Sequence, residues 1–156
     1  MGHGSDDPES IAILQLPALP ESAASGRRFI AKTLAGWGLA GLSDMAVLLG
    51  NELITNALVH AGSAVEVRLV RRRSTLRVAV RDTSGGMPVR RFYSLEARSG
   101  RGLAMVEALA TRWGVTPLSA GGKTVWFELP SPDGNGRLPL MADLGHVRPA
   151  GAAATD

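Results

Sequence analysis

The sequence contains no cysteine among its 156 residues, which excludes disulfide frameworks, thiolate metal sites and cysteine nucleophiles and fits a reducing compartment. Aromatic residues are scarce, at 4%, so an aromatic platform for stacking nucleic-acid bases is not expected. No apolar run approaches the roughly 20 residues that a membrane-spanning helix needs. The polar, acidic residues 1–10 do not resemble a signal peptide. We therefore expect a cytoplasmic protein without a membrane segment.

Lysine is also scarce, since only Lys32 and Lys123 accompany fifteen arginines. Ten of the arginines lie within residues 64–101 against three acidic residues, whereas residues 1–21 carry four acidic residues and no basic one. The basic stretch suits an anionic partner, such as nucleotide phosphate, nucleic acid or an acidic protein surface. A solvated arginine-rich surface explains it equally well, so charge alone does not assign a function.

Hydrophobic periodicity and glycine or proline breaks predict one domain, residues 11–130, between a disordered lead (1–10) and a disordered tail (131–156). The expected strands are 11–16, 65–69, 76–82, 114–118 and 123–129. The expected helices are 21–39, a second from an N-cap at Ser43 or Asp44 to about 60, and a third from 100 with Leu103, Val106, Ala110 and Trp113 on one stripe. This order predicts the α+β class, a two-layer α/β sandwich whose mixed, mostly antiparallel sheet has its helices on one face.

Two polar side chains interrupt one stripe of the second predicted helix, which is apolar nearly all round. Glu52 and Asn56 are spaced i and i+4, so they lie about 40° apart on one stripe. A carboxylate and an amide on a core-facing stripe are costly unless something pairs with them. One interpretation is a pocket in which the two groups hold Mg²⁺ or a water. The other is a hydrogen-bonded pair at the helix surface.

The predicted strand at 76–82 ends on an acid. Leu76, Val78 and Val80 recur at every second position, and this two-residue period places Asp82 on their face. One explanation is a buried carboxylate that faces a ligand amine. The other is an Asx turn that caps the following glycine-rich loop.

The third predicted helix opens with glycines. At Gly100-Arg101-Gly102 the exposed backbone N–H groups and the helix dipole favour an anion. The glycines let a phosphate approach the backbone closely, and Arg101 can reach its oxygen atoms. The G-x-G pattern is common, so by itself it does not identify a nucleotide site.

Together these features occur in the order of a known family. The segments 52–57 (ELITNA), 80–86 (VRDTSGG), 100–103 (GRGL) and 122–127 (GKTVWF) resemble the motifs of the GHKL ATPase superfamily. That superfamily includes gyrase, heat-shock chaperones, histidine kinases and mismatch-repair ATPases. The resemblance covers roughly residues 11–130, and the small size and short lid are similar to the anti-sigma-factor serine kinase branch. The D-x-G-x-G box departs from the family pattern, because Ser84 replaces its middle glycine.

The resemblance implies a role for each motif. Glu52 would be the general base that deprotonates a substrate hydroxyl, and Asn56 would coordinate the Mg²⁺ that bridges the ATP phosphates. Asp82 would accept a hydrogen bond from the adenine amino group, with Thr124 assisting nearby and Gly86 lining the base. The phosphate-binding residues would be Gly100, Arg101, Gly102 and Leu103, with residues 87–99 as the lid.

The resemblance also implies partners. The leading hypothesis is an ATP-dependent protein serine/threonine kinase that binds a sigma factor in one state and phosphorylates an anti-anti-sigma antagonist in another, with a homodimer as the expected assembly. The alternative is a non-catalytic module of the same fold, whose nucleotide state a partner reads. A detached histidine-kinase catalytic domain would need a phosphoacceptor domain, for which no segment of this sequence is suited. Nucleic-acid binding through the arginines at 71–73 rests on charge alone.

Overall fold

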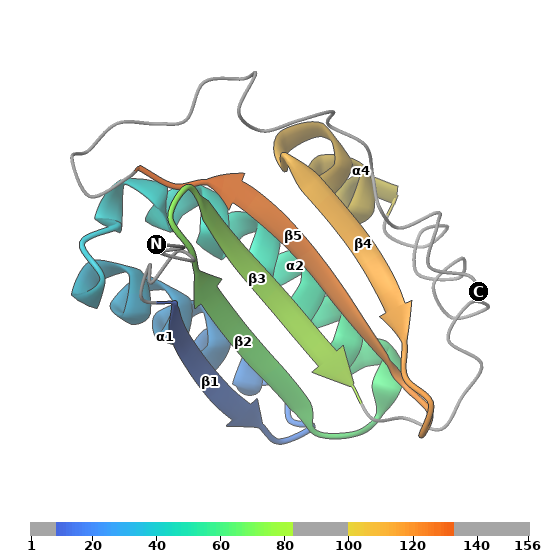
Figure 1. The fold of residues 1–156 in the computed structure, drawn as a ribbon. Helices are drawn as coiled ribbons and strands as arrows, with labels where there is room; N and C mark the ends of the chain where they lie inside the picture. Colours follow the sequence, from blue (N-terminus) through green and yellow to red (C-terminus); the bar gives the residue numbers. More distant parts are fainter. Residues whose placement is uncertain (1–8, 83–99, 133–156) are drawn as a thin grey trace, which may run out of the picture.

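The computed structural model describes residues 9–82 and 100–132, in which one sheet is covered on one face by helices (Figure 1). The elements in chain order are β1 (Ser10–Leu16), α1 (Ser22–Gly36), the 3₁₀ helix η1 (Ala40–Leu42), α2 (Ser43–Ala61), β2 (Val65–Arg71), β3 (Thr75–Asp82), α4 (Gly100–Leu109), β4 (Arg112–Pro117) and β5 (Lys123–Pro130). Apart from η1, this succession of strands and helices is the predicted one.

The predicted lead and tail fall mostly outside the described residues. At the tail boundary, Ser131 is fully buried and its backbone N–H donates to the carbonyl of Ser74 at 2.9 Å. The folded part therefore continues past the predicted boundary at residue 130.

The five strands lie in the order β1-β2-β3-β5-β4. Every neighbouring pair among them is antiparallel, so the α+β prediction is confirmed, while the expected mixed character of the sheet is not found in the described part. A tight turn closes the β2–β3 hairpin, where the N–H of Arg72 donates to the carbonyl of Thr75. The pairing of β3 with β5 places Asp82 opposite Lys123 at one end of the sheet and Leu76 opposite Leu129 at the other.

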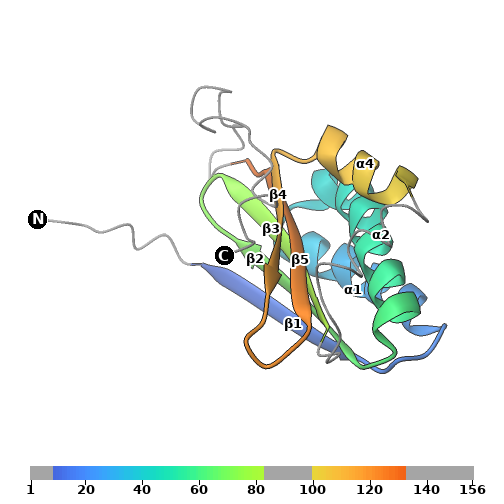
Figure 2. The ribbon, with the colours of Figure 1, turned by 90° about the vertical axis from the view of Figure 1, so that its right-hand side faces the viewer.

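The helices α1, α2 and α4 form one layer against the sheet, with α2 in the middle, α1 on one side of it and α4 on the other (Figure 2). Most strand side chains that face this layer are apolar, and Val67, Val78 and Phe127 among them are completely buried. Because successive strand residues point to opposite faces, the polar residues between them lie on the outer face of the sheet. The hydrophobic core therefore lies between the sheet and the helix layer.

The start of α2 differs from the prediction. The sequence places an N-cap at Ser43 or Asp44, but the N-cap is Leu42 and no side chain caps the helix. The reason is that η1 leads directly into α2, so the chain enters the helix already wound. The end is as predicted, because Gly62 adopts a left-handed conformation with φ of 63°, which glycine tolerates without steric strain.

The end of α4 also differs from the prediction. The helix ends at Leu109, so Trp113, expected on its apolar stripe, lies in β4 instead. The N–H of Thr111 already donates to the carbonyl of Glu128 at 2.9 Å. Strand pairing therefore begins two residues after the helix and removes Trp113 from the helical pattern.

Helices α1 and α2 approach closely at two glycines. A Cβ atom on Gly26 would meet the Cδ1 of Ile54 at 2.6 Å, and one on Gly50 would meet the Cδ1 of Ile30 at 2.6 Å. Each glycine thus accommodates an isoleucine of the other helix. These contacts fix which flank of α2 faces α1, and hence which flank is left for other partners.

Candidate functional site

Glu52 and Asn56 lie on the flank of α2 that faces away from α1. The α1 side of α2 is marked by Gly50 and Asn51, which contact that helix. At 100° per residue, the mean direction of Glu52 and Asn56 lies about 170° from the mean direction of these two residues. Both are half-buried, so they occupy the margin of the buried stripe rather than its centre. The flank that carries them is the one along which α4 lies (Figure 2).

Asp82 is the last residue of β3, and only 2% of it is exposed. It lies opposite Val65 and Lys123 on the face that carries the helices, as the strand period predicts. Its Oδ2 atom accepts a hydrogen bond from Nζ of Lys123 at 3.1 Å, and 3% of the lysine side chain is exposed. The buried acid is therefore part of a dry ion pair, which sequence reasoning did not anticipate.

Thr124 does not lie beside Asp82, and this expectation needs correction. In an antiparallel pair, directly opposite residues share a face, and Thr124 lies opposite Arg81, which is exposed. The register therefore places Thr124 on the outer face of the sheet, while Lys123 takes the position beside the acid. Parity along the sequence does not decide between the two faces, because the apolar Val125 and Trp126 have opposite parity.

The remaining predicted residues belong to the segment from 83 to 103. Gly86 and the expected lid, residues 87–99, lie outside the described residues. The backbone of Gly100, Arg101, Gly102 and Leu103 forms the first turn of α4. The first N–H groups of a helix have no partner within it, so this turn retains the anion-binding character that the sequence indicates.

The C-terminal end of α2 is close along the chain to the strand residue that pairs with Asp82. Only residues 62–64 separate the end of α2 from Val65, which pairs with Asp82. Asn56 lies about one and a half turns before the end of α2. Asn56 and the Asp82–Lys123 pair therefore lie toward the same end of the sheet, whereas Glu52 lies at the middle of α2.

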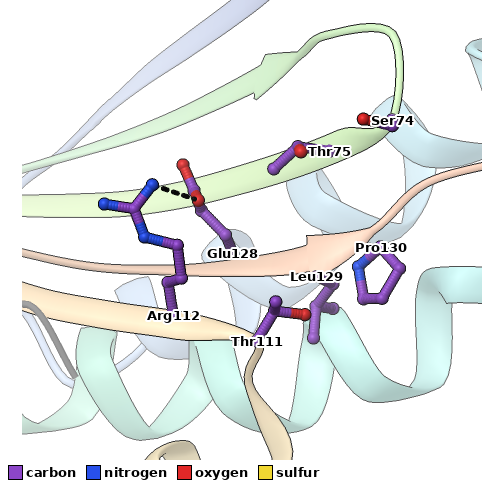
Figure 3. Close-up of a pocket in the computed structure, with 7 residues that line it drawn as sticks. All are labelled: Ser74, Thr75, Thr111, Arg112, Glu128, Leu129 and Pro130. Carbon is purple, nitrogen blue, oxygen red and sulfur yellow. Dashed lines mark ion pairs between the residues drawn. The ribbon is translucent and has the colours of Figure 1, made fainter. Parts of the chain in front are cut away.

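A separate hollow of about 210 Å³ lies at the opposite end, where β3 begins and β5 ends. Figure 3 shows its lining, in which the Arg112 guanidinium reaches Glu128 at 3.6 Å. Arg77 also contacts Glu128, at 2.7 Å. The charged groups of this hollow are engaged with one another, and none of the predicted site residues lies in it.

The donor set suits the ATP and Mg²⁺ that the resemblance implies. Mg²⁺ prefers hard oxygen ligands and is held by few protein groups when phosphates supply the rest. The Asn56 amide and the Glu52 carboxylate offer such oxygens one turn apart on a half-buried flank. In residues 9–82 and 100–132 no three His, Cys, Asp or Glu side chains gather as a metal cluster. Nucleotide phosphates would therefore have to complete the coordination.

Comparison with known proteins agrees with this geometry. Residues 41–133 match the family described as "Histidine kinase-, DNA gyrase B-, and HSP90-like ATPase". This region contains α2, the end of β3 with Asp82, the first turn of α4, and β5. No curated protein matches the chain. Among the described residues, the helices are too short or too polar to cross a bilayer. Since the match covers more than half of the sequence, the chain belongs to the family of histidine kinase-, DNA gyrase B- and HSP90-like ATPases.

Proposed function

We propose that this protein is a regulatory kinase that uses ATP to phosphorylate a serine or threonine of an antagonist protein, and that it binds a sigma factor in its other state. The family binds and hydrolyses ATP. The observation that carries the kinase proposal is the position of Glu52, a half-buried carboxylate one turn from Asn56 on the flank that faces α4. A domain that only bound nucleotide would have no need of a base at this position.

Asn56, Glu52 and the first turn of α4 would each have a separate role in phosphoryl transfer. Phosphoryl transfer requires positioning and charge neutralisation more than covalent participation by the protein. Bound ATP with Mg²⁺ would supply the phosphoryl group and neutralise its charge. The amide oxygen of Asn56 would hold the metal ion, and the first turn of α4 would orient the phosphates. Glu52 would accept the proton of the attacking hydroxyl, which requires it to lie within hydrogen-bond reach of that group.

The consequence for the partner is electrostatic. A phosphate adds up to two negative charges to the antagonist and disrupts an interface by repulsion and desolvation. The antagonist would then release this protein, which would become free to bind the sigma factor. The alternative, a non-catalytic module, needs only a change of partner affinity with nucleotide state.

The experiment measures phosphate transfer and nucleotide affinity in the same variants. Radiolabelled ATP is incubated with the full chain and candidate anti-anti-sigma proteins, and nucleotide affinity is measured by calorimetry. Glu52→Gln should leave affinity nearly unchanged and lower transfer by about 10²–10⁴-fold, the usual contribution of a general base. Asn56→Ala should weaken nucleotide binding in the presence of Mg²⁺ and abolish transfer.

Asn51→Ala is the matched control, because it removes the same side chain from the α1 side of α2. It should change neither affinity nor transfer. Transfer at the wild-type rate by Glu52→Gln would remove Glu52 as the base. If wild-type protein phosphorylates no partner that it binds, while ATP alters that binding, the non-catalytic module is the correct function.

A further inference from the structure

The Asp82–Lys123 ion pair is a feature of this chain that the proposed function leaves unexplained. It lies at the end of β3 and the start of β5, on the helix-facing side of the sheet, with both side chains at least nine-tenths buried. Buried ion pairs are weak stabilising devices, because the penalty for removing two charges from water offsets their attraction. Two apolar residues at this position would serve the core equally well.

The basic residue of this ion pair is a lysine, in a chain that otherwise uses arginine almost throughout. Fifteen of the seventeen Lys and Arg residues are arginine, yet the buried acid is paired with lysine. The arginine guanidinium tends to engage both oxygens of a carboxylate, whereas the lysine ammonium is a compact group with three rotatable donors. The contact from Nζ to Oδ2 at 3.1 Å therefore does not prevent Lys123 from donating to a second acceptor.

The pair places a hydrogen-bond acceptor directly beside a donor. The Watson–Crick edge of adenine has the complementary arrangement, because the N6 amino group donates and the adjacent N1 atom accepts. We infer that Lys123 determines base specificity by donating to N1 of adenine while Asp82 accepts from the N6 amino group. This inference rests on the nucleotide site of the proposed function, in which Asp82 lies against the base, and it assigns Lys123 a role that the sequence analysis gave to Thr124.

The test changes one atom of the ligand at a time and leaves the fold intact. The full chain is titrated by calorimetry with ADP, 1-deaza-ADP and 7-deaza-ADP in Mg²⁺, so that turnover does not contribute heat. The 1-deaza analogue lacks the N1 acceptor, whereas the 7-deaza analogue keeps the edge that faces the ion pair. Loss of a hydrogen bond to a charged donor should weaken binding of 1-deaza-ADP by about tenfold or more. Binding of 7-deaza-ADP should stay close to that of ADP.

Two variants then assign the effect to one residue. In Lys123→Met the affinities for 1-deaza-ADP and 7-deaza-ADP should become nearly equal. Thr124→Val changes the neighbouring residue on the outer face. In this variant the ratio of the affinity for 7-deaza-ADP to that for 1-deaza-ADP should remain as in the wild type. Lys123→Gln restores a neutral donor and should recover part of the difference between the two affinities. This variant also replaces Lys123→Met in the test if Lys123→Met is too unstable to titrate.

The outcomes separate this inference from the proposed kinase function. Equal binding of the two analogues by the wild type overturns the role of Lys123 but leaves nucleotide binding and transfer intact. A ratio that persists in Lys123→Met and disappears in Thr124→Val returns the role to Thr124. Failure of all three nucleotides to bind overturns both. Absence of phosphate transfer, with the predicted ratio present, contradicts the kinase function alone.

Discussion

Strands β3 and β5 carry two ion pairs that differ in almost every respect. The Lys123–Asp82 pair lies on the helix-facing side at one end, with 3% and 2% of its side chains exposed. The Arg77–Glu128 pair lies on the outer face toward the other end, with 31% and 8% exposed. The first joins one nitrogen to one oxygen in a dry environment. The second joins two Arg77 nitrogens, Nε and Nη2, to one glutamate oxygen at 2.8 and 2.7 Å.

The outer pair also has supporting contacts. The Arg77 guanidinium lies 3.9 Å from the centroid of the Trp126 ring, and Arg112 approaches Glu128 from the neighbouring strand. Loss of one partner on the outer face therefore leaves others in place, and water can replace part of what is lost. A buried charge that loses its counter-ion cannot be rescued by water in this way. The outer pair is thus a structural clamp with several supporting contacts, whereas the inner pair is the one for which we infer a role in recognition.

The largest effect is expected from breaking the inner pair. Lys123→Met should lower the free energy of unfolding by about 3–5 kcal/mol, because it leaves a buried carboxylate without the lysine that neutralises it. Adding Asp82→Asn to Lys123→Met removes the second charge and should recover most of the loss. Urea denaturation measures both. Additive destabilisation in the double variant would contradict the view that an uncompensated charge is the cause.

An intermediate effect is expected from crowding the outer clamp. A Cβ atom on Gly114 would meet Cζ2 of Trp126 at 2.7 Å and Cε2 at 2.9 Å. The indole ring is rigid and Arg77 covers it, so it cannot move aside as an aliphatic side chain would. Gly114→Ala should destabilise by about 1–3 kcal/mol, the usual cost of overpacking. Thermal denaturation measures the change.

Gly36→Ala is the control for this substitution, because a Cβ atom at Gly36 would have nothing within 4 Å of it. Gly36 ends α1, and alanine there should be neutral or stabilise by up to about 1 kcal/mol. Equal destabilisation by the two substitutions would show that Trp126 does not restrict Gly114.

The smallest effects on stability are expected from replacing, one at a time, the two arginines that contact Glu128. Arg77→Met should cost about 1–2 kcal/mol, because it removes a charged hydrogen bond and the stacking on Trp126. Arg112→Met should cost less than about 0.5 kcal/mol, because Arg112 is 45% exposed and 3.6 Å from the carboxylate. Denaturation at low salt and at 1 M salt measures both effects. At 1 M salt the Debye length is only about 3 Å, so the effect of Arg112→Met should disappear. A reversed ranking would contradict the clamp.

Much of the fold could be predicted because its elements are strongly periodic. Alternation in β2 and β3 identified the buried face, and Gly62 identified the end of α2, since both signals are local. The start of α2 was not predictable from Ser43 and Asp44, because a preceding 3₁₀ turn removes the need for a cap. The end of α4 was not predictable either, since pairing of Thr111 with β5 decides it.

For the candidate site too, the positions of some residues could be predicted from the sequence and those of others could not. The positions of Glu52 and Asn56 follow from helix geometry, and Asp82 follows from the strand period. The face of Thr124 does not, because β5 carries large apolar residues on both faces. Val125 and Phe127 face the helices, while Trp126 is buried on the outer face beneath Arg77. Only the register with β3 resolves this ambiguity and shows that Lys123 contacts the acid.

The strand order has a consequence for how quickly the chain can fold. The β2–β3 and β4–β5 hairpins form between neighbours in sequence, but β1 must pair with residues 65–71 and β3 with residues 123–130. Each of these distant pairings pays the entropy of closing a long loop before it gains contacts. Folding should therefore take milliseconds to seconds rather than microseconds. The two hairpins would form early, and the β3–β5 pairing that brings Lys123 to Asp82 would come late, so the site is assembled only as folding is completed.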